Sequence, residues 1–194
     1  MQRFLLAVTG ASGMPYALAL AEALKQSGQA QTHLIVSEAA AHVMELECDA
    51  GLDRLTSQAA ATSSADDIGA PPASGSWLHH GMIVCPCSMA SLGAIARGLG
   101  TNLIHRAADV CLKEKRPLIL VPRETPLSLV HLENMQAAAR AGATILPACP
   151  GFYHRPRSID ELTAHVVGRI LDALGVEHRL FPRWGEPEAA SDDS

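Results

Sequence analysis

The chain has 194 residues, of which 48% are hydrophobic and only 18% are charged, and its formal net charge is −5. This length fits one globular domain with a substantial core, and the composition excludes wholesale disorder, which requires low hydrophobicity and high net charge. The negative charge gives no reason to expect general nucleic-acid affinity, and no run of about 18 apolar residues is present that would span a membrane.

A strand followed by a helix recurs along the chain. Strands are predicted over residues 3–8, 32–36, 82–85, 117–121 and 143–146, and helices over residues 14–26, 38–47, 89–99, 103–115, 126–141 and 159–174. The strand over 117–121 is fully apolar, which is typical of a strand buried on both faces of a parallel sheet. Alternating units of these lengths predict a single α/β domain with an open, doubly wound parallel sheet and right-handed crossovers.

Capping residues mark the ends of the last two helices. Thr125 can cap the first of these helices, with Pro126 at its first position, and Gly142 occupies the left-handed position at its end. Ser158 and Glu161 have the spacing of a capping box at the start of the second helix. Its apolar stripe consists of Ile159, Leu162, Val166, Ile170 and Leu174.

Two segments lie outside this alternation. Residues 56–76 are rich in Ala, Ser, Gly, Pro and Asp, and we expect them to form a mobile excursion from the domain. Residues 185–194 are acidic and rich in small side chains, and we expect them to form a disordered tail. The folded domain is therefore predicted to cover residues 1–184.

The cysteine content and the first residues bear on the cellular compartment. Five cysteines are an odd number for a chain of this size, which favours free thiols in a reducing compartment. The first residues lead into a short apolar stretch without a small-residue cleavage site, so no secretion signal is expected. Together these features predict a cytoplasmic protein.

Small and polar residues follow the first two predicted strands. Ligands of open α/β sheets bind outside the carboxyl ends of the strands, near the point where the strand order reverses. Gly10-Ala11-Ser12-Gly13 lies at such an end and would let backbone amides and a helix N-terminus approach a phosphate or a flat ring. The tetrapeptide lacks the full dinucleotide-binding spacing, so an ordinary tight turn is equally consistent with it. Ser37 ends the second strand, where a simple helix cap is the alternative.

The third predicted strand leads into Cys85-Pro86-Cys87-Ser88. No second Cys or His pair with zinc-site spacing follows. We therefore predict no metal site here. Ser88 and Ser91, three residues apart at a helix start, can hydrogen-bond a phosphate or a ring edge instead.

Two sets of charged residues lie in the middle of the chain. Arg106, Asp109 and Lys113 share one helical face, for which a salt-bridge ladder on a solvated surface is the simpler interpretation. Arg123 and Glu124 follow the most hydrophobic strand directly. An arginine there is well placed for a phosphate, and a carboxylate there can act as a general acid or base.

Four further residues near the C-terminal end have two interpretations each. Tyr153 follows the fifth predicted strand and Arg169 flanks the last apolar stripe, where a rim aromatic and a surface arginine are the alternatives. His131 and His154 belong to no Ser–His–Asp or Cys–His pattern, so structural or surface histidines are favoured.

Ordered motifs run through the whole chain. They are residues 9–13, 86–89, 102–104, 106–110, 112–114, 123–127, 131–135, 150–153 and 168–172. With these motifs the chain resembles the UbiX family of flavin prenyltransferases over residues 3–184. The resemblance implies a Rossmann-like flavoprotein domain that binds FMN.

The chemistry implied by the resemblance is a metal-free prenyl transfer. A dimethylallyl group would move from dimethylallyl monophosphate to N5 and C6 of reduced FMN, with phosphate as the leaving group. The product, prenylated FMN, would serve UbiD-type decarboxylases. Family members form homo-oligomers, as dodecamers, with active sites where subunits meet, so the resemblance also implies such an assembly.

The resemblance also implies functions for the individual residues that match the family motifs. FMN would lie against Gly10, Ala11, Ser12, Ser37, Ser88, Met89, Ala90, Ser91 and Arg123. The prenyl phosphate would be held by Lys113, Arg123, Glu124, Tyr153 and Arg169, with Arg106 nearby and Glu47 at a further acidic position. Glu124 would manage protons, Ser12 would orient the flavin, and Trp184 would stabilise allylic cation character through its aromatic face.

The sequence leaves two alternative functions open. One is an FMN-binding cysteine decarboxylase of the same fold, whose family carries a Pro-x-Met-Asn segment where this chain has Pro86-Cys87-Ser88-Met89. The other is a non-catalytic FMN carrier or chaperone subunit, which would not need the phosphate-binding set.

Overall fold

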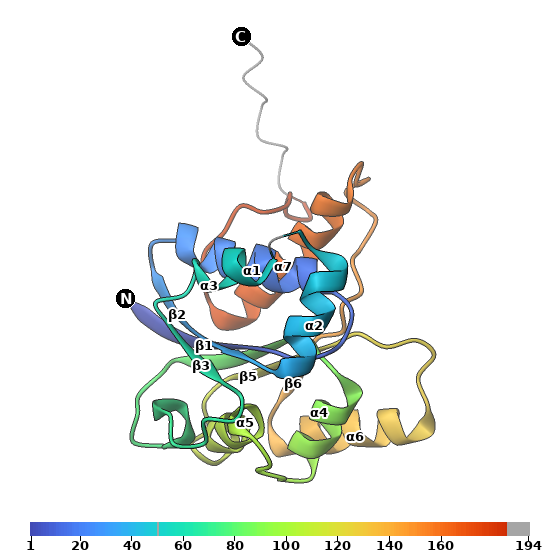
Figure 1. Cartoon of the computed structure of the whole chain (residues 1–194). Coiled ribbons are helices and arrows are strands. Elements are labelled where there is room, and N and C mark those ends of the chain that lie inside the picture. Colours follow the sequence, from blue (N-terminus) through green and yellow to red (C-terminus); the bar gives the residue numbers. More distant parts are fainter. Residues whose placement is uncertain (50, 186–194) are drawn as a thin grey trace.

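Six parallel strands form one sheet in the computed structural model, which describes residues 1–49 and 51–185 (Figure 1). The strands are β1 (Gln2–Val8), β2 (Ala30–Val36), β3 (Ala61–Ser64), β4 (Gly81–Cys87), β5 (Leu118–Pro122) and β6 (Thr144–Ile145). Their order across the sheet is β3-β2-β1-β4-β5-β6. The predicted doubly wound parallel sheet is therefore confirmed, with one strand more than predicted.

Helices cover both faces of the sheet. On one face lie α1 (Met14–Gln26), α2 (Glu38–Glu47), α3 (Gly51–Thr56) and α7 (Ile159–Leu174) (Figure 1). On the other face lie α4 (Met89–Ala96), α5 (Leu103–Lys113), α6 (Leu129–Ala141) and the 3₁₀ turn η1 (Pro71–Ala73) (Figure 1). This arrangement divides the core into two layers.

Side-chain alternation along the central strands fills both layers. In β1, Phe4, Leu6 and Val8 pack toward α1 and α7, whereas Leu5 and Ala7 pack toward α4 and α5. Successive side chains of a strand point to opposite faces, so a strand covered on both sides must be apolar throughout. This requirement explains the continuous hydrophobic runs of β1, β4 and β5.

The two cysteines of β4 lie in different core layers. Cys85 packs in the layer of α1 and α7, and Cys87 packs in the layer of α4 and α5. Residues two apart in a regular strand share a face, so this arrangement requires an irregularity at the end of β4. The pairing of β4 with β5 shifts in register between Val84 and Cys87, and the strand extends two residues beyond its predicted end. Burial raises the pKa of both thiols.

The predicted mobile excursion over residues 56–76 instead includes an edge strand and a helical turn. β3 pairs with β2, and His33 Nε2 lies 2.9 Å from Ser63 Oγ across that pair. η1 packs under α5, where Arg106 donates from Nε to the carbonyl of Ala73 at 3.1 Å. The sequence of β3 is short and polar, so it carries no apolar alternation, and only the backbone ladder offered by β2 makes it a strand.

Helix α6 begins later than predicted. Its N-cap is Ser128, whose Oγ accepts from the amide of His131, while His131 Nδ1 accepts from the amide of Ser128, both at 3.3 Å. This reciprocal pair satisfies two amides at once, so the helix starts there and the predicted cap at Thr125 with Pro126 is wrong. The structural interpretation of His131 is confirmed. Gly142 takes the left-handed conformation at the helix end, as predicted.

The other helix ends show smaller differences. The helices predicted to reach residues 99 and 115 stop at Ala96 and Lys113. Ser158 caps α7 as predicted, but the Glu161 carboxylate accepts from the amide of Arg157, at 2.6 Å, in place of the Ser158 amide. Ile159 is 75% exposed and does not join the apolar stripe of α7.

Part of the predicted C-terminal tail lies outside the described residues. This part is 186–194. Across residues 1–49 and 51–185, no helix combines the length and apolarity needed to cross a membrane.

Candidate active site

Two loops meet at the carboxyl ends of the central strands. β1 and β4 are neighbours in the sheet, and the helices that follow them, α1 and α4, lie on opposite faces. Loops that diverge in this way leave a crevice at the sheet edge, which is where open α/β sheets bind ligands. Residues 9–13 and 88–91 belong to these two loops, so both segments lie at the same edge of the sheet, as the sequence predicts.

Thr9 joins these two loops. Its hydroxyl donates to the carbonyl of Pro86 at 2.9 Å and accepts from the amide of Ser88 at 2.7 Å, and the residue is 2% exposed. Ser88 in turn caps α4 by accepting from the Ser91 amide, and its hydroxyl donates to Ser91 Oγ at 3.1 Å. Because Ser91 Oγ accepts that bond, its own proton remains available for a ligand. Sequence reasoning gave Thr9 no role, because only the pairing of β1 with β4 reveals its contacts.

Gly10 and Ser37 bring α2 close to the first loop. Ser37 caps α2 by accepting from the Ala40 amide at 3.1 Å, while the flavin contact implied by the resemblance stays a prediction. Its hydroxyl still has a proton to donate. A Cβ on Gly10 would lie 2.6 Å from the Cβ of Ala39, so only glycine permits this approach.

Glu47 caps α1 from a different helix. The N-cap position of α1 is Gly13, which has no side chain, and the Glu47 carboxylate accepts from the amides of Gly13 and Met14, each at 2.8 Å. A negative charge at a helix N-terminus is favoured by the orientation of the peptide dipoles. Two of the amides predicted to approach a phosphate are therefore already bound to a carboxylate, so a ligand must use other donors of the loop.

The surroundings of Glu47 keep its carboxylate ionised. Burial acts to raise its pKa, but hydrogen bonds from the Ser12 hydroxyl and from the amides of Gly13 and Met14, together with the charge of Arg123, outweigh burial. The pKa of Glu47 therefore lies below its ordinary value. This ties Ser12, Glu47 and Arg123 into one cluster.

Replacing Glu47 with glutamine is expected to lower the free energy of unfolding at pH 7 by about 1–3 kcal/mol, because it weakens charge-assisted hydrogen bonds. A depressed folded-state pKa gives stability that is present above the unfolded pKa of about 4.5 and is lost as the pH falls through the folded value. The difference between the two proteins should therefore shrink in acid. Urea denaturation at pH 7 and pH 4 measures it, and a difference independent of pH would contradict the assignment.

Arg123 and Glu124 lie at the end of β5, beside the crevice. The Arg123 guanidinium donates from Nε to the carbonyl of Ser12 at 3.1 Å, so it reaches across from β5 to the β1 loop. The Glu124 side chain is exposed, and its Oε1 accepts from the amide of Thr125 at 3.1 Å. The structure thus brings Arg123 to the residues predicted to hold the flavin.

A second cluster forms around Tyr153. Its hydroxyl lies 3.0 Å from His165 Nε2, and its ring meets the ring of Trp184 edge-on, with centroids 5.4 Å apart. Arg169 follows His165 by one turn of α7, and its charge lowers the pKa of His165 after burial and His154. Tyr153 and Trp184, which are far apart in sequence, are therefore in contact, and Arg169 lies one turn of α7 beyond His165.

The segment that carries Trp184 is anchored on α7. Asp172 accepts from Arg183 at 2.7 Å, from His178 at 3.1 Å and from Arg169 at 3.0 Å. Burial acts to raise the pKa of Asp172, but hydrogen bonds from Arg183 and His178 outweigh it and lower the value. A Cβ on Gly168 would lie 2.3 Å from the Phe181 ring, so the glycine lets this segment pack closely.

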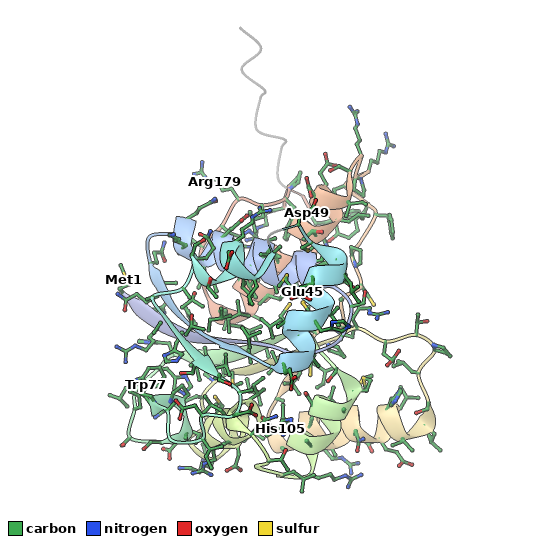
Figure 2. All side chains as sticks on the ribbon, viewed as in Figure 1. Met1, Glu45, Asp49, Trp77, His105 and Arg179 are labelled. Atoms are coloured by element: carbon green, nitrogen blue, oxygen red, sulfur yellow. The ribbon has the colours of Figure 1, made fainter. Side chains whose placement is uncertain are left out.

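Arg106 and Lys113 make their side-chain contacts with residues outside both clusters. α5 runs back along the sheet, so Lys113 stands just before β5, while Arg123 follows the other end of that strand. β5 has five residues, which corresponds to about 17 Å. Lys113 pairs with Glu114 beside Gly75, and Trp77 and Met1 mark this side of the molecule in Figure 2.

The predicted salt-bridge ladder of α5 forms only in part. Arg106 pairs with Asp109 at 2.7 Å, but Lys113 pairs with Glu114 and not with Asp109. Both side chains of the Arg106 pair are about two-fifths exposed, so the simpler surface interpretation describes this helix within one chain. The phosphate-binding role implied for Arg106 and Lys113 requires another element to approach them.

Three comparisons place the chain among known proteins. Residues 1–171 match the family model described as Flavoprotein. The chain is 47% identical over 206 residues to flavin prenyltransferase UbiX of Pseudomonas aeruginosa, a match that covers 99% of this chain and 98% of that protein.

Two solved structures have nearly the same fold. AnUbiX in complex with FMN and dimethylallyl pyrophosphate has a TM-score of 0.93 and 42% identity, covering 96% of this chain and 99% of that one. A dodecameric FMN-dependent UbiX-like decarboxylase from Escherichia coli O157:H7 has a TM-score of 0.93 and 42% identity, covering 95% of this chain and 100% of that one.

Proposed function

The chain belongs to the flavoprotein family and, within it, to the UbiX-type flavin prenyltransferases, and from that membership we propose the reaction it performs. It transfers a dimethylallyl group from dimethylallyl monophosphate to N5 and C6 of reduced FMN and releases phosphate without a metal. The observation that carries this proposal is the Arg123 guanidinium, which lies across the crevice, 3.1 Å from the carbonyl of Ser12, with Glu124 next to it.

The crevice residues fit FMN. Gly10, Ala11 and Ala90 have little or no side chain, so a flat ring can approach the backbone of both loops. Hydroxyl groups stand at three points of the crevice, on Ser12, Ser37 and Ser91, and hydroxyls suit the polar edges of a flavin and its phosphate oxygens. Ser88 and Met89 complete the predicted flavin set by starting α4, so the N-terminus of that helix also faces the crevice.

The leaving phosphate needs cationic and hydroxyl donors. Arg123, Arg169 and the Tyr153 hydroxyl are the donors that this chain supplies, and their hydrogen bonds strengthen as charge develops on the departing oxygen. Trp184 is 84% exposed, with its ring against Tyr153, so an aromatic face is present for cation–π stabilisation of the allylic group.

Proton transfer is assigned to the exposed carboxylate beside Arg123. Bound reduced FMN supplies the nucleophilic N5 and C6 atoms, where bond formation displaces protons. The C–O bond to the phosphate breaks as the bond to N5 forms, and the Glu124 carboxylate would accept the N5 proton as a general base. The bond to C6 consumes the alkene of the transferred group, so one of the two displaced protons goes to an alkene carbon and the other leaves with the phosphate. Ser12, held by Glu47 and Arg123, orients the ring, so we assign Glu47 to positioning the loop.

Arg106 and Lys113 complete the phosphate site from a second copy of the chain. In a single chain Lys113 stands about one strand length from Arg123, so a homo-oligomer with sites at its interfaces would bring the two sets together. The related E. coli O157:H7 protein is described as dodecameric, and we propose a dodecamer here. We also propose that the protein is cytoplasmic and passes prenylated FMN to a UbiD-type decarboxylase.

Anaerobic incubation with reduced FMN and dimethylallyl monophosphate is expected to yield a flavin heavier by one prenyl unit. Mass spectrometry of the extracted flavin measures this, with dimethylallyl pyrophosphate as a parallel donor because AnUbiX was solved with it. Oxidised FMN serves as the control and should stay unchanged. An unchanged mass from folded, FMN-binding protein would contradict the enzyme and favour an FMN carrier.

A further inference from the structure

His165 lies between two hydrogen-bonding groups near the proposed phosphate site. It is 6% exposed, on the buried side of α7. Its Nδ1 accepts from the backbone amide of Gly151 at 3.2 Å, and its Nε2 lies 3.0 Å from the hydroxyl of Tyr153. Both ring nitrogens are therefore engaged, one by a group that can only donate.

This asymmetry determines where the proton of the ring lies. A backbone amide is only a donor, so Nδ1 must be the unprotonated nitrogen. A neutral imidazole then carries its proton on Nε2, which makes Nε2 the donor toward Tyr153. A doubly protonated ring would place two N–H groups against each other at Gly151, so the neutral form is favoured.

The environment also favours the neutral ring. Burial lowers the pKa of His165, and so do the neighbouring His154 and Arg169. The ring of His154 stacks on that of His165, with centroids 5.1 Å apart and planes 8° apart. A protonated His165 would therefore be a charge removed from water and close to the charge of Arg169, and both effects cost free energy.

We propose that His165 is a positioning residue that makes Tyr153 a hydrogen-bond donor to the prenyl phosphate. Because Nε2–H donates to the phenolic oxygen, the hydroxyl proton of Tyr153 must point elsewhere, and a phosphate oxygen is the acceptor that it meets. This inference rests on the proposed function, which supplies the phosphate. It adds to that function the hydrogen-bond direction at Tyr153.

Close packing restricts the relative orientation of the Tyr153 and His165 rings. A Cβ on Gly151 would lie 2.8 Å from Tyr153 Cε1 and 3.3 Å from His165 Cε1, so the loop approaches as closely as a glycine allows. The edge-on contact with Trp184 holds the other side of the Tyr153 ring. Rotation of the phenol away from Nε2 would therefore disturb several contacts at once.

Two substitutions at His165 separate hydrogen-bond direction from packing. In His165→Gln, the amide oxygen can accept from Gly151 while its N–H₂ donates to Tyr153, so the KM for dimethylallyl monophosphate should stay within about twofold. In His165→Glu, an ionised carboxylate only accepts, so it binds the tyrosine proton, and this KM should rise by about tenfold or more. FMN affinity should stay unchanged in both variants.

Combining each His165 substitution with Tyr153→Phe tests whether its effect acts through the Tyr153 hydroxyl. Without the hydroxyl, His165→Glu should raise KM no further, whereas repulsion between the new carboxylate and the phosphate would act in that background too. Equal KM values for His165→Gln and His165→Glu, or a full effect of His165→Glu without the hydroxyl, would overturn the proposal.

A spectroscopic measurement decides the tautomer without turnover. ¹⁵N spectra of the protein with labelled histidine, assigned by loss of signal in His165→Gln, should show a protonated Nε2 and an unprotonated Nδ1. The opposite tautomer or a doubly protonated ring at pH 7 would overturn the inference even in an active enzyme. If unsubstituted protein failed to prenylate FMN, the proposed function would fall, and the tautomer would still be decided here.

Discussion

Glu124→Gln is expected to slow prenyl transfer by about 100-fold or more while FMN binding stays unchanged, which is the range for loss of a general acid or base. Glutamine keeps the size of the side chain and its acceptor oxygen for the Thr125 amide, so the loop should hold its shape. Only the capacity to take up a proton is removed. The single-turnover rate under anaerobic conditions measures the effect, and an FMN titration measures binding.

A matched control for this variant is Glu133→Gln, which removes an exposed carboxylate from α6, nine residues after Glu124. It should retain the rate of the unsubstituted protein. Loss of FMN binding in Glu124→Gln would show that Glu124 positions the flavin, and the assignment of proton transfer would then be wrong.

Lys113→Ala and Arg123→Ala are each expected to lower activity by about 100-fold or more, because each removes a cation that binds the departing phosphate. When the two variants are expressed together, activity should return to about one quarter of the unsubstituted level. A shared site needs an intact Arg123 from one chain and an intact Lys113 from its neighbour, and random mixing supplies both in about one site of four.

The control for mixing uses two residues expected on the same side of the site. Arg123 and Glu124 are adjacent at the end of β5, so mixed Arg123→Ala and Glu124→Gln proteins should show no comparable recovery. Activity of differently tagged, co-purified oligomers measures both mixtures. Absence of recovery for Lys113 with Arg123 would mean that one chain supplies both residues after a rearrangement of α5.

The elements that the sequence predicted best are those with strong local signals. The bounds of α1 and α2 agree with the prediction at both ends, because Gly13 and Ser37 precede regular helical patterns. The start of α6 and the strand β3 were not predicted correctly. Both depend on partners that a local pattern does not show: a reciprocal bond between Ser128 and His131, and the free edge of β2.

Only part of the candidate site could be predicted from the sequence. Residues at the carboxyl ends of β1, β4 and β5 had to meet at one edge, since the strands of a parallel sheet end on the same side. The sequence could not show that Glu47 caps α1, because the contact joins residues 34 positions apart. It missed His165 for a similar reason, although its spacing of four from Arg169 was a usable signal.

The sequence by itself determined the layered α/β fold, the edge of the sheet where ligands bind and the family to which the motifs belong. These follow from hydrophobic periodicity and from residue types at strand ends, which are local properties of the chain. Only the tertiary structure decided that Arg123 reaches Ser12, that Lys113 stands about one strand length away, and that the Tyr153 hydroxyl lies 3.0 Å from His165 Nε2. Those outcomes depend on distances between segments remote in sequence, and such distances exist only once the sheet has brought the segments together.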